Sequence, residues 1–142
     1  MNIDESVACC RALGDPTRMR LVRLLATSND EACLCEFEAS LEEPAYKLSR
    51  HLKILRDAGL LRGEKEGRWV YHRVAVDPEA LMHLIGFVRA ASDEEGIYAR
   101  DYQRFVEIQK CRTGGRCRGA DSRYEGDPQA QIPDLRARRA RA

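Results

Sequence analysis

Residues 44–74, PAYKLSRHLKILRDAGLLRGEKEGRWVYHRV, decide the fold. The first half predicts an amphipathic helix, because apolar residues recur at helical spacing at Ala45, Leu48, Leu52 and Leu55. Pro44 suits the start of this helix, and Gly59 suits the position just after its end. Residues 60–62 and 69–74 then read as two strands, with GEKEG (63–67) as the hairpin turn between them.

Further helices are predicted on both sides of this segment. Residues 4–13, 16–26 and 35–41 precede it, and Asp15-Pro16 gives the second of them an N-cap followed by proline. Asp77-Pro78 repeats that start for a helix over 78–91, and the capping-box pattern SDEE (92–95) predicts another that continues to about Lys110. The fold class is therefore mainly α with a small β-hairpin, in the order of a winged helix-turn-helix.

Composition limits the class of protein. The chain has 142 residues, enough for one domain of modest core, and no apolar run long enough to span a membrane. No secretory signal is visible, so we expect a cytoplasmic protein whose six cysteines are not structural disulfides. We expect the domain to cover residues 1–111 and a flexible arginine-rich tail to cover 112–142.

The net charge of +1 hides an asymmetry between these two parts. The tail holds eight arginines against four acidic residues, which leaves residues 1–111 at −3. Overall charge therefore does not indicate a nucleic-acid partner, and only the local pattern of residues can do so. The second helix of a helix-turn-helix offers polar side chains to base edges, and the wing reaches the backbone. The residues predicted to contact DNA are Tyr46, Lys47, Ser49, Arg50, His51 and Lys53 in the helix and Lys65 and Arg68 in the hairpin.

Residues 7–90 resemble the ArsR/SmtB family of small bacterial metal-sensing repressors. The resemblance lies in three motifs that occur in this order: ALGDPTRMRLVRLL, LSRHLKILRDAGLL and EGRWVYHRV. The resemblance implies a homodimer joined through the first helix and the helix at 78–91, bound to double-stranded operator DNA. The latter helix is apolar around too much of its circumference for a lone surface helix, which favours an interface.

The stretch EACLCEFE (31–38) resembles the cysteine motif of the family's arsenic and cadmium sensors, with Cys33 and Cys35 as the metal ligands. Phe37 stands where some arsenic sensors have a third thiol, so the third ligand is open among Cys9, Cys10, Cys111 and Cys117. Thiolates select soft ions, and a helix N-terminus lowers cysteine pKa. Positions i and i+2 diverge on a helix, so sharing an ion requires that the helix has not begun at Cys33 or that it unwinds.

The resulting hypothesis is a repressor that As(III) releases from its operator, with no organic cofactor. Sb(III) is an alternative inducer, as are Cd or Pb with Cys9 or Cys10 as extra ligands, and an oxidant acting through a disulfide is a further one. A thiol enzyme such as an arsenate reductase is disfavoured, because Glu31, Glu36 and Glu38 would repel an oxyanion. A structural zinc module is disfavoured because C-x-C is not its usual spacing.

Overall fold

A computed structural model describes residues 1–117 of the chain, and the rest of the arginine-rich tail, 118–142, lies outside the described residues. The described part holds helices and one hairpin in the order α1 (Ile3–Leu13), α2 (Pro16–Ser28), α3 (Leu34–Leu41), α4 (Ala45–Asp57), β1 (Leu61–Glu66), β2 (Trp69–Val74), α5 (Pro78–Ala90) and α6 (Ile97–Lys110). This is the predicted winged helix-turn-helix, with α3 and α4 as its helix pair. In residues 1–117 no helix is both long and apolar enough to cross a membrane.

Local signals fix most of the helix ends. The Asp15 carboxylate accepts a hydrogen bond from the Arg18 N–H at 3.0 Å and Pro16 opens α2, as the sequence predicts. Gly59, with a positive φ of 79°, follows the end of α4 and turns the chain into the hairpin.

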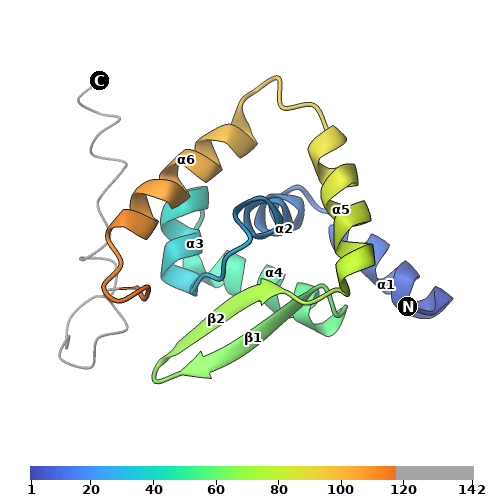
Figure 1. The fold of residues 1–142 in the computed structure, drawn as a ribbon, viewed down its shortest axis with the longest axis horizontal. Helices are drawn as coiled ribbons and strands as arrows, with labels where there is room; N and C mark the ends of the chain where they lie inside the picture. The colour runs from blue at the N-terminus through green and yellow to red at the C-terminus, as the bar shows by residue number, and fades with distance from the viewer. Residues whose placement is uncertain (118–142) are drawn as a thin grey trace.

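The core gathers around α2, which lies centrally in Figure 1. Helices α3 and α6 lie at one end of the molecule, α1 and α5 lie at the other, and the hairpin forms one edge. Large side chains from four helices are fully buried between these elements: Leu21 and Leu25 of α2, Phe37 and Leu41 of α3, Leu48, Leu52 and Leu55 of α4, and Phe105 of α6. The polar face of α4 is thereby left to solvent.

The hairpin, called the wing below, is longer than the sequence predicts. β1 and β2 pair antiparallel from Leu61–Val74 out to Glu66–Trp69, so the chain reverses over Gly67 and Arg68 alone. The assignment of all of GEKEG to the turn was wrong. Gly67 has a φ of 61°, which lets two residues make the reversal and frees the charged residues before it to extend the strand.

The start of α6 also differs from the prediction. The helix begins at Ile97 rather than after Ser92, and Gly96 at φ 68° is its N-cap. The Asp93 carboxylate reaches forward and accepts hydrogen bonds from the N–H groups of Tyr98 and Ala99 at 3.1 and 3.0 Å. An acidic cap is therefore present, but it is supplied from the preceding loop and not by a capping box.

Candidate thiol site and nucleic-acid interface

One face of α4 carries four of the six helix residues that are predicted to contact DNA. Tyr46, Ser49, Arg50 and Lys53 are exposed and follow the i, i+3, i+4, i+7 spacing of a single helix face. Tyr46 keeps 75% of its surface exposed, which is unusual for an aromatic residue in a small domain and leaves its ring free for a partner.

Several side chains of α4 that are predicted to contact DNA also contact other residues of the protein. Lys47 pairs with Glu43 at 3.1 Å, and Lys53 pairs with Asp57 at 2.6 Å on the surface. The His51 ring points back into the protein, where its Nδ1 lies 3.2 Å from an Arg18 guanidinium nitrogen. In the wing, Lys65 and Arg68 are both exposed at or next to the tip.

Three cysteines from two distant parts of the chain form a buried cluster. The sulfurs of Cys33, Cys35 and Cys117 all lie within 4.8 Å of one another. Cys33 Sγ and Cys35 Sγ are 3.0 Å apart, and Cys35 Sγ and Cys117 Sγ are 3.4 Å apart. All three residues are at most 5% exposed. We call this group the thiol cluster.

The helix start explains how a C-x-C pair converges. Cys33 is the N-cap of α3 with extended backbone, φ −92° and ψ 168°, and the helix begins only at Leu34. The Glu36 carboxylate accepts a hydrogen bond from the Cys33 N–H at 3.1 Å and fixes this turn. The two thiols therefore meet without any unwinding of α3. Of the two conditions under which a C-x-C pair can share an ion, the first holds: the helix has not begun at Cys33.

The expectation of lowered thiol pKa values was wrong. A hydrogen bond with the Cys117 thiol, burial and the Glu36 carboxylate raise the pKa of both Cys33 and Cys35 above the ordinary value of a free cysteine. The helix N-terminus is outweighed because these groups lie in a dry cluster beside a carboxylate. At neutral pH both side chains are thiols rather than thiolates.

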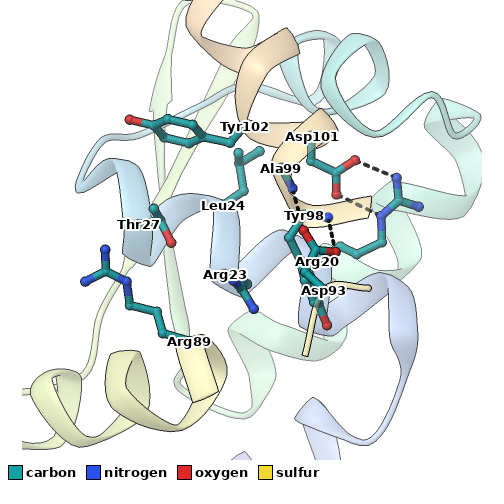
Figure 2. Close-up of a pocket in the computed structure, with 10 residues that line it drawn as sticks. All are labelled: Arg20, Arg23, Leu24, Thr27, Arg89, Asp93, Tyr98, Ala99, Asp101 and Tyr102. Atoms are coloured by element: carbon teal, nitrogen blue, oxygen red, sulfur yellow. Dashed lines mark hydrogen bonds and ion pairs between the residues drawn. The ribbon is translucent and has the colours of Figure 1, made fainter. Parts of the chain in front are cut away.

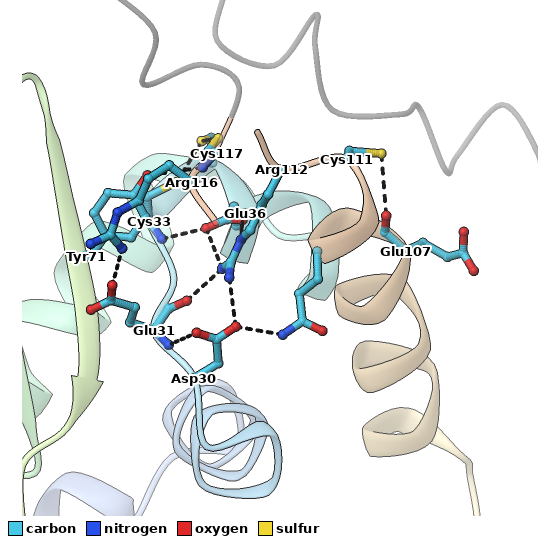
Figure 3. A network of polar contacts seen from close by, with 12 residues as sticks. Asp30, Glu31, Cys33, Glu36, Tyr71, Glu107, Cys111, Arg112, Arg116 and Cys117 are labelled. Carbon is cyan, nitrogen blue, oxygen red and sulfur yellow. Dashed lines mark hydrogen bonds and ion pairs between the residues drawn. The ribbon is translucent and has the colours of Figure 1, made fainter. Parts of the chain in front are cut away.

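Residues 112–117, which the sequence places in the tail, pack against α3 and the wing; we call this segment the strap. Arg112 holds its start, because its guanidinium donates to Glu36 at 2.7 Å, to Asp30 at 2.7 Å and to the Glu31 carbonyl at 2.7 Å (Figure 3). Glu36 is fully buried, so this ion pair compensates a charge that would otherwise be costly. The ion pairs also raise the pKa of Arg112 against the opposing effect of burial.

The end of the strap contacts the wing. The Cys117 N–H donates to the Tyr71 hydroxyl at 3.2 Å, and the Arg116 guanidinium lies 4.6 Å from the centroid of the Tyr71 ring. Arg116 also pairs with Glu66 of β1 at 2.9 Å and with Glu31. Figure 3 shows Cys33 at the start of α3, Tyr71 of the wing, and Arg116 and Cys117 of the strap lying close together.

The remaining cysteines lie outside the cluster. Cys111 donates its thiol to the Glu107 carbonyl of α6 at 3.4 Å. Cys9 contacts the Ala58 carbonyl at 3.5 Å, and Cys10 is exposed on α1. Among the four candidates for a third ligand, Cys117 is thus the one placed beside Cys33 and Cys35.

A buried histidine joins the wing to both helices of the helix-turn-helix. The backbone of His72 pairs with Ala32, directly before Cys33, through hydrogen bonds of 2.8 and 3.0 Å. Its Nε2 lies 2.7 Å from an Arg56 nitrogen of α4. Since arginine only donates, Nε2 accepts and the ring is neutral. Burial, with the Arg56 charge adding to it, lowers the pKa of His72 to about 4.

A second hollow, between α2, α5 and α6, is lined by several arginines (Figure 2). Arg20 donates to both carboxylate oxygens of Asp101 at 2.9 and 2.8 Å. Arg23 donates to the Val88 carbonyl at 2.7 Å and lies over the Tyr98 ring. These groups already have partners within the protein, so they hold the three helices together.

An apolar surface extends over α1 and α5. Ile3, Met82 and Phe87 are 78%, 74% and 65% exposed, and a hollow lined by Cys9, Leu13, Leu84 and other apolar side chains lies within it. Val88, in contrast, is buried against the rest of the fold. Large exposed apolar side chains around an apolar hollow are typical of an interaction site.

Sequence reasoning did not assign Arg112, Tyr71 or Arg116 to the site. Cys117 was one of four open candidates, and its only local signal was the turn sequence TGG before it. In the structure Gly114 and Gly115 both have positive φ and reverse the chain toward α3.

Comparison with known proteins agrees with this architecture. A family model described as a helix-turn-helix domain matches residues 13–64. The fold is similar to that of HlyU from Vibrio cholerae N16961, with a TM-score of 0.55 and 24% identity over 63% of this chain and 96% of that one.

Relatives in sequence are transcriptional regulators. The chain is 39% identical over 74 residues to the uncharacterized HTH-type transcriptional regulator MJ1325 of Methanocaldococcus jannaschii, covering 52% of this chain and 82% of that protein. It is 44% identical over 64 residues to the arsenic resistance transcriptional regulator ArsR1 of Pseudomonas putida. These residues make up 45% of this chain and 49%, about half, of that relative. Over 95 residues it is 35% identical to the HTH-type transcriptional repressor SmtB of Mycobacterium tuberculosis, 67% of each chain.

Proposed function

Because this chain belongs to the ArsR/SmtB family of helix-turn-helix repressors, and so is a DNA-binding regulator rather than an enzyme, we propose that it is an As(III)-responsive repressor. As a homodimer it binds operator DNA through α4 and the wing. Arsenite bound by Cys33, Cys35 and Cys117 releases it.

The observation that carries this proposal is the thiol cluster. Three buried sulfurs already lie within 4.8 Å, and the cluster contains no fourth cysteine, histidine or carboxylate among the residues that the structure describes. The nearest carboxylate, Glu36, is engaged by Arg112 and by the Cys33 N–H. Three soft donors and no hard ones suit a soft, three-coordinate centre such as As(III) or Sb(III).

Charge balance also favours a trivalent metalloid. Three thiols condense with uncharged arsenous acid so that three As–S bonds form, three As–O bonds break and three waters leave. The product is neutral, which suits a buried site. A divalent ion on the same three sulfurs releases three protons and leaves a net negative charge beside Glu36, which costs more in a dry environment.

The DNA-binding half of the proposal is supported by exposure and spacing. Arg50 and its neighbours on one face of α4 are exposed, as contacts to base edges require, and Lys65 and Arg68 in the wing are exposed, as contacts to phosphates require. A homodimer through the apolar surface of α1 and α5 would present two copies of this face to a two-fold symmetric site.

The first test is titration of the reduced protein with arsenite, followed by thiolate-to-arsenic absorbance. We expect one tightly bound arsenite per chain, lost or strongly weakened in Cys33→Ser, Cys35→Ser and Cys117→Ser. Cys111→Ser is the matched control, because that thiol is six residues from Cys117 but contacts Glu107 instead. Arsenite binding that survives all three substitutions would refute the site.

An oxidant-released repressor is the second candidate. The 3.4 Å between the Cys35 and Cys117 sulfurs is short enough for a disulfide after small movements. Peroxide would take two electrons from the two thiols and leave as water. Release of operator by peroxide in metal-free buffer, with arsenite inert, would favour this candidate over the metalloid sensor.

A further inference from the structure

The strap carries one ligand of the thiol cluster and also the contacts to the wing. Building on the proposed function, we infer that Tyr71 and Arg116 are positioning residues that transmit occupancy of the thiol cluster to the wing. The signal then reaches DNA through the hairpin, and α3 keeps its helical structure.

Tyr71 is the first of the two links. It lies in β2 and is 2% exposed, and its hydroxyl accepts the N–H of Cys117 at 3.2 Å. Its ring belongs to the same buried cluster as the three thiols, with Trp69 packed beside it. A shift of the Cys117 backbone therefore acts directly on the central part of β2.

Arg116 is the second link, and it reaches the other strand. Its guanidinium pairs with Glu66 at the tip end of β1 at 2.9 Å. It also pairs with Glu31, just before the cluster, and lies over the Tyr71 ring (Figure 3). One side chain next to Cys117 thus contacts both wing strands and the segment that leads into α3.

The three thiols are not held equally firmly. Cys33 and Cys35 are fixed by the first turn of α3 and by Glu36, whereas Cys117 follows a turn in which Gly114 and Gly115 have positive φ. Cys33 and Cys35 are already 3.0 Å apart, so the adjustment needed to bond three sulfurs to one arsenic falls mainly on Cys117. The Tyr71 and Arg116 contacts pass that adjustment to the wing.

The test compares operator affinity with and without saturating arsenite for the wild type, Tyr71→Phe and Arg116→Gln. Allosteric coupling typically changes affinity by about 5-fold to 150-fold, and we expect a value in that range for the wild type. Each variant should bind arsenite with wild-type stoichiometry and bind operator when metalloid-free, yet show at most about one third of the wild-type fold-change.

Two control variants separate coupling from general damage. Arg73→Gln removes a wing ion pair with Glu64 that makes no contact with the strap, and Tyr102→Phe removes a hydroxyl on α6. Both variants should keep the wild-type ratio between operator affinity without arsenite and operator affinity with arsenite, even if each affinity changes. Release of Tyr71→Phe and Arg116→Gln equal to that of the wild type would overturn the inference.

Hydrogen exchange on the wild type covers the case in which a variant fails to fold or to bind DNA. Arsenite should change the exchange of wing amides in residues 61–74 and leave the α3 amides protected. Unchanged wing amides would overturn the inference while leaving the proposed function in place. Failure of the wild type to bind arsenite would instead refute the proposed function at the first step.

Discussion

At the scale of single residues, the thiol cluster shows how burial alters cysteine chemistry. Proximity to a helix N-terminus normally favours the thiolate, but here the hydrogen bond with Cys117, burial and Glu36 raise the pKa of Cys33 and Cys35. The reacting species at neutral pH is the thiol. Neutral thiols favour an inducer such as As(III), whose complex with three sulfurs carries no net charge, over a divalent ion, whose complex would be negatively charged.

The protonated state predicts contrasting pH dependences. Arsenite binding consumes three thiols and uncharged arsenous acid without net proton release, so its affinity should be nearly constant from pH 6 to pH 8. Cadmium must displace the protons, so its affinity should rise steeply with pH over the same range. Competitive titrations at several pH values measure both, and an arsenite affinity that rises as steeply as that of cadmium would contradict the assignment of neutral thiols.

Arg50 is the residue on which the predicted base readout most depends. Replacing it with alanine should weaken operator binding by about 1–3 kcal/mol, because a bidentate contact to guanine is lost. Arsenite affinity should be unchanged, since Arg50 is exposed on α4 and contacts none of the three cysteines. Operator gel shifts and arsenite titrations on the same preparation test both parts.

Among the structural residues, Arg112 should matter most to stability. Arg112→Met leaves the fully buried Glu36 carboxylate without its partner, and breaking such a pair costs about 3–5 kcal/mol. Arg73→Gln, which breaks an exposed pair, should cost at most about 1 kcal/mol. Urea unfolding measures the free energy of unfolding of both variants. A loss in Arg112→Met no larger than the loss in Arg73→Gln would contradict this prediction.

At the scale of elements, His72 links the wing to α4 and to the segment before α3. Its pKa of about 4 in the folded protein lies below the unfolded value near 6.5. Below pH 6.5 the unfolded chain therefore takes up a proton that the folded chain excludes, and stability falls as the pH drops toward 4.

The expected loss from this histidine between pH 7 and pH 5 is about 2 kcal/mol. His72→Gln can still accept from Arg56 but does not titrate, so its free energy of unfolding should depend less on pH over this interval. Urea unfolding at the two pH values provides the measurement, with His83→Gln on α5 as the control. An equal pH dependence in His72→Gln and the wild type would exclude His72 as the source.

At the scale of the whole molecule, the apolar surface of α1 and α5 predicts a homodimer. Phe87→Arg places a charge in the middle of that surface and should shift the species in solution from twice the chain mass to 16.1 kDa. Tyr46→Arg, at an aromatic residue on the α4 face that is even more exposed than Phe87, should leave the dimer intact. Light scattering during size exclusion distinguishes the two, and a Phe87→Arg dimer would place the interface elsewhere.

Much of this architecture is determined by local sequence, because the interactions that start and end its helices and turns involve residues close together in the chain. Caps such as Asp15, the apolar spacing of α4 and the glycine after it act within a few residues, so they define the helices and the hairpin wherever the chain later packs. The same holds for the C-x-C pair, whose two thiols belong to one helix start. The two boundaries that differed are set by the positive φ of Gly67 and by hydrogen bonds from Tyr98 and Ala99 back to Asp93 in the preceding loop.

Tertiary structure alone decided the remainder of the site. Cys117 is 82 residues from Cys35, and the turn sequence TGG before it does not by itself select Cys117 over Cys9, Cys10 or Cys111 as a ligand. Its place depends on Arg112 finding the buried Glu36 and on Tyr71 accepting its N–H. The raised pKa values of Cys33 and Cys35 likewise depend on burial and on the hydrogen bond with Cys117, which is distant in sequence. Such effects depend on which surfaces are excluded from water together, and only the folded chain specifies that.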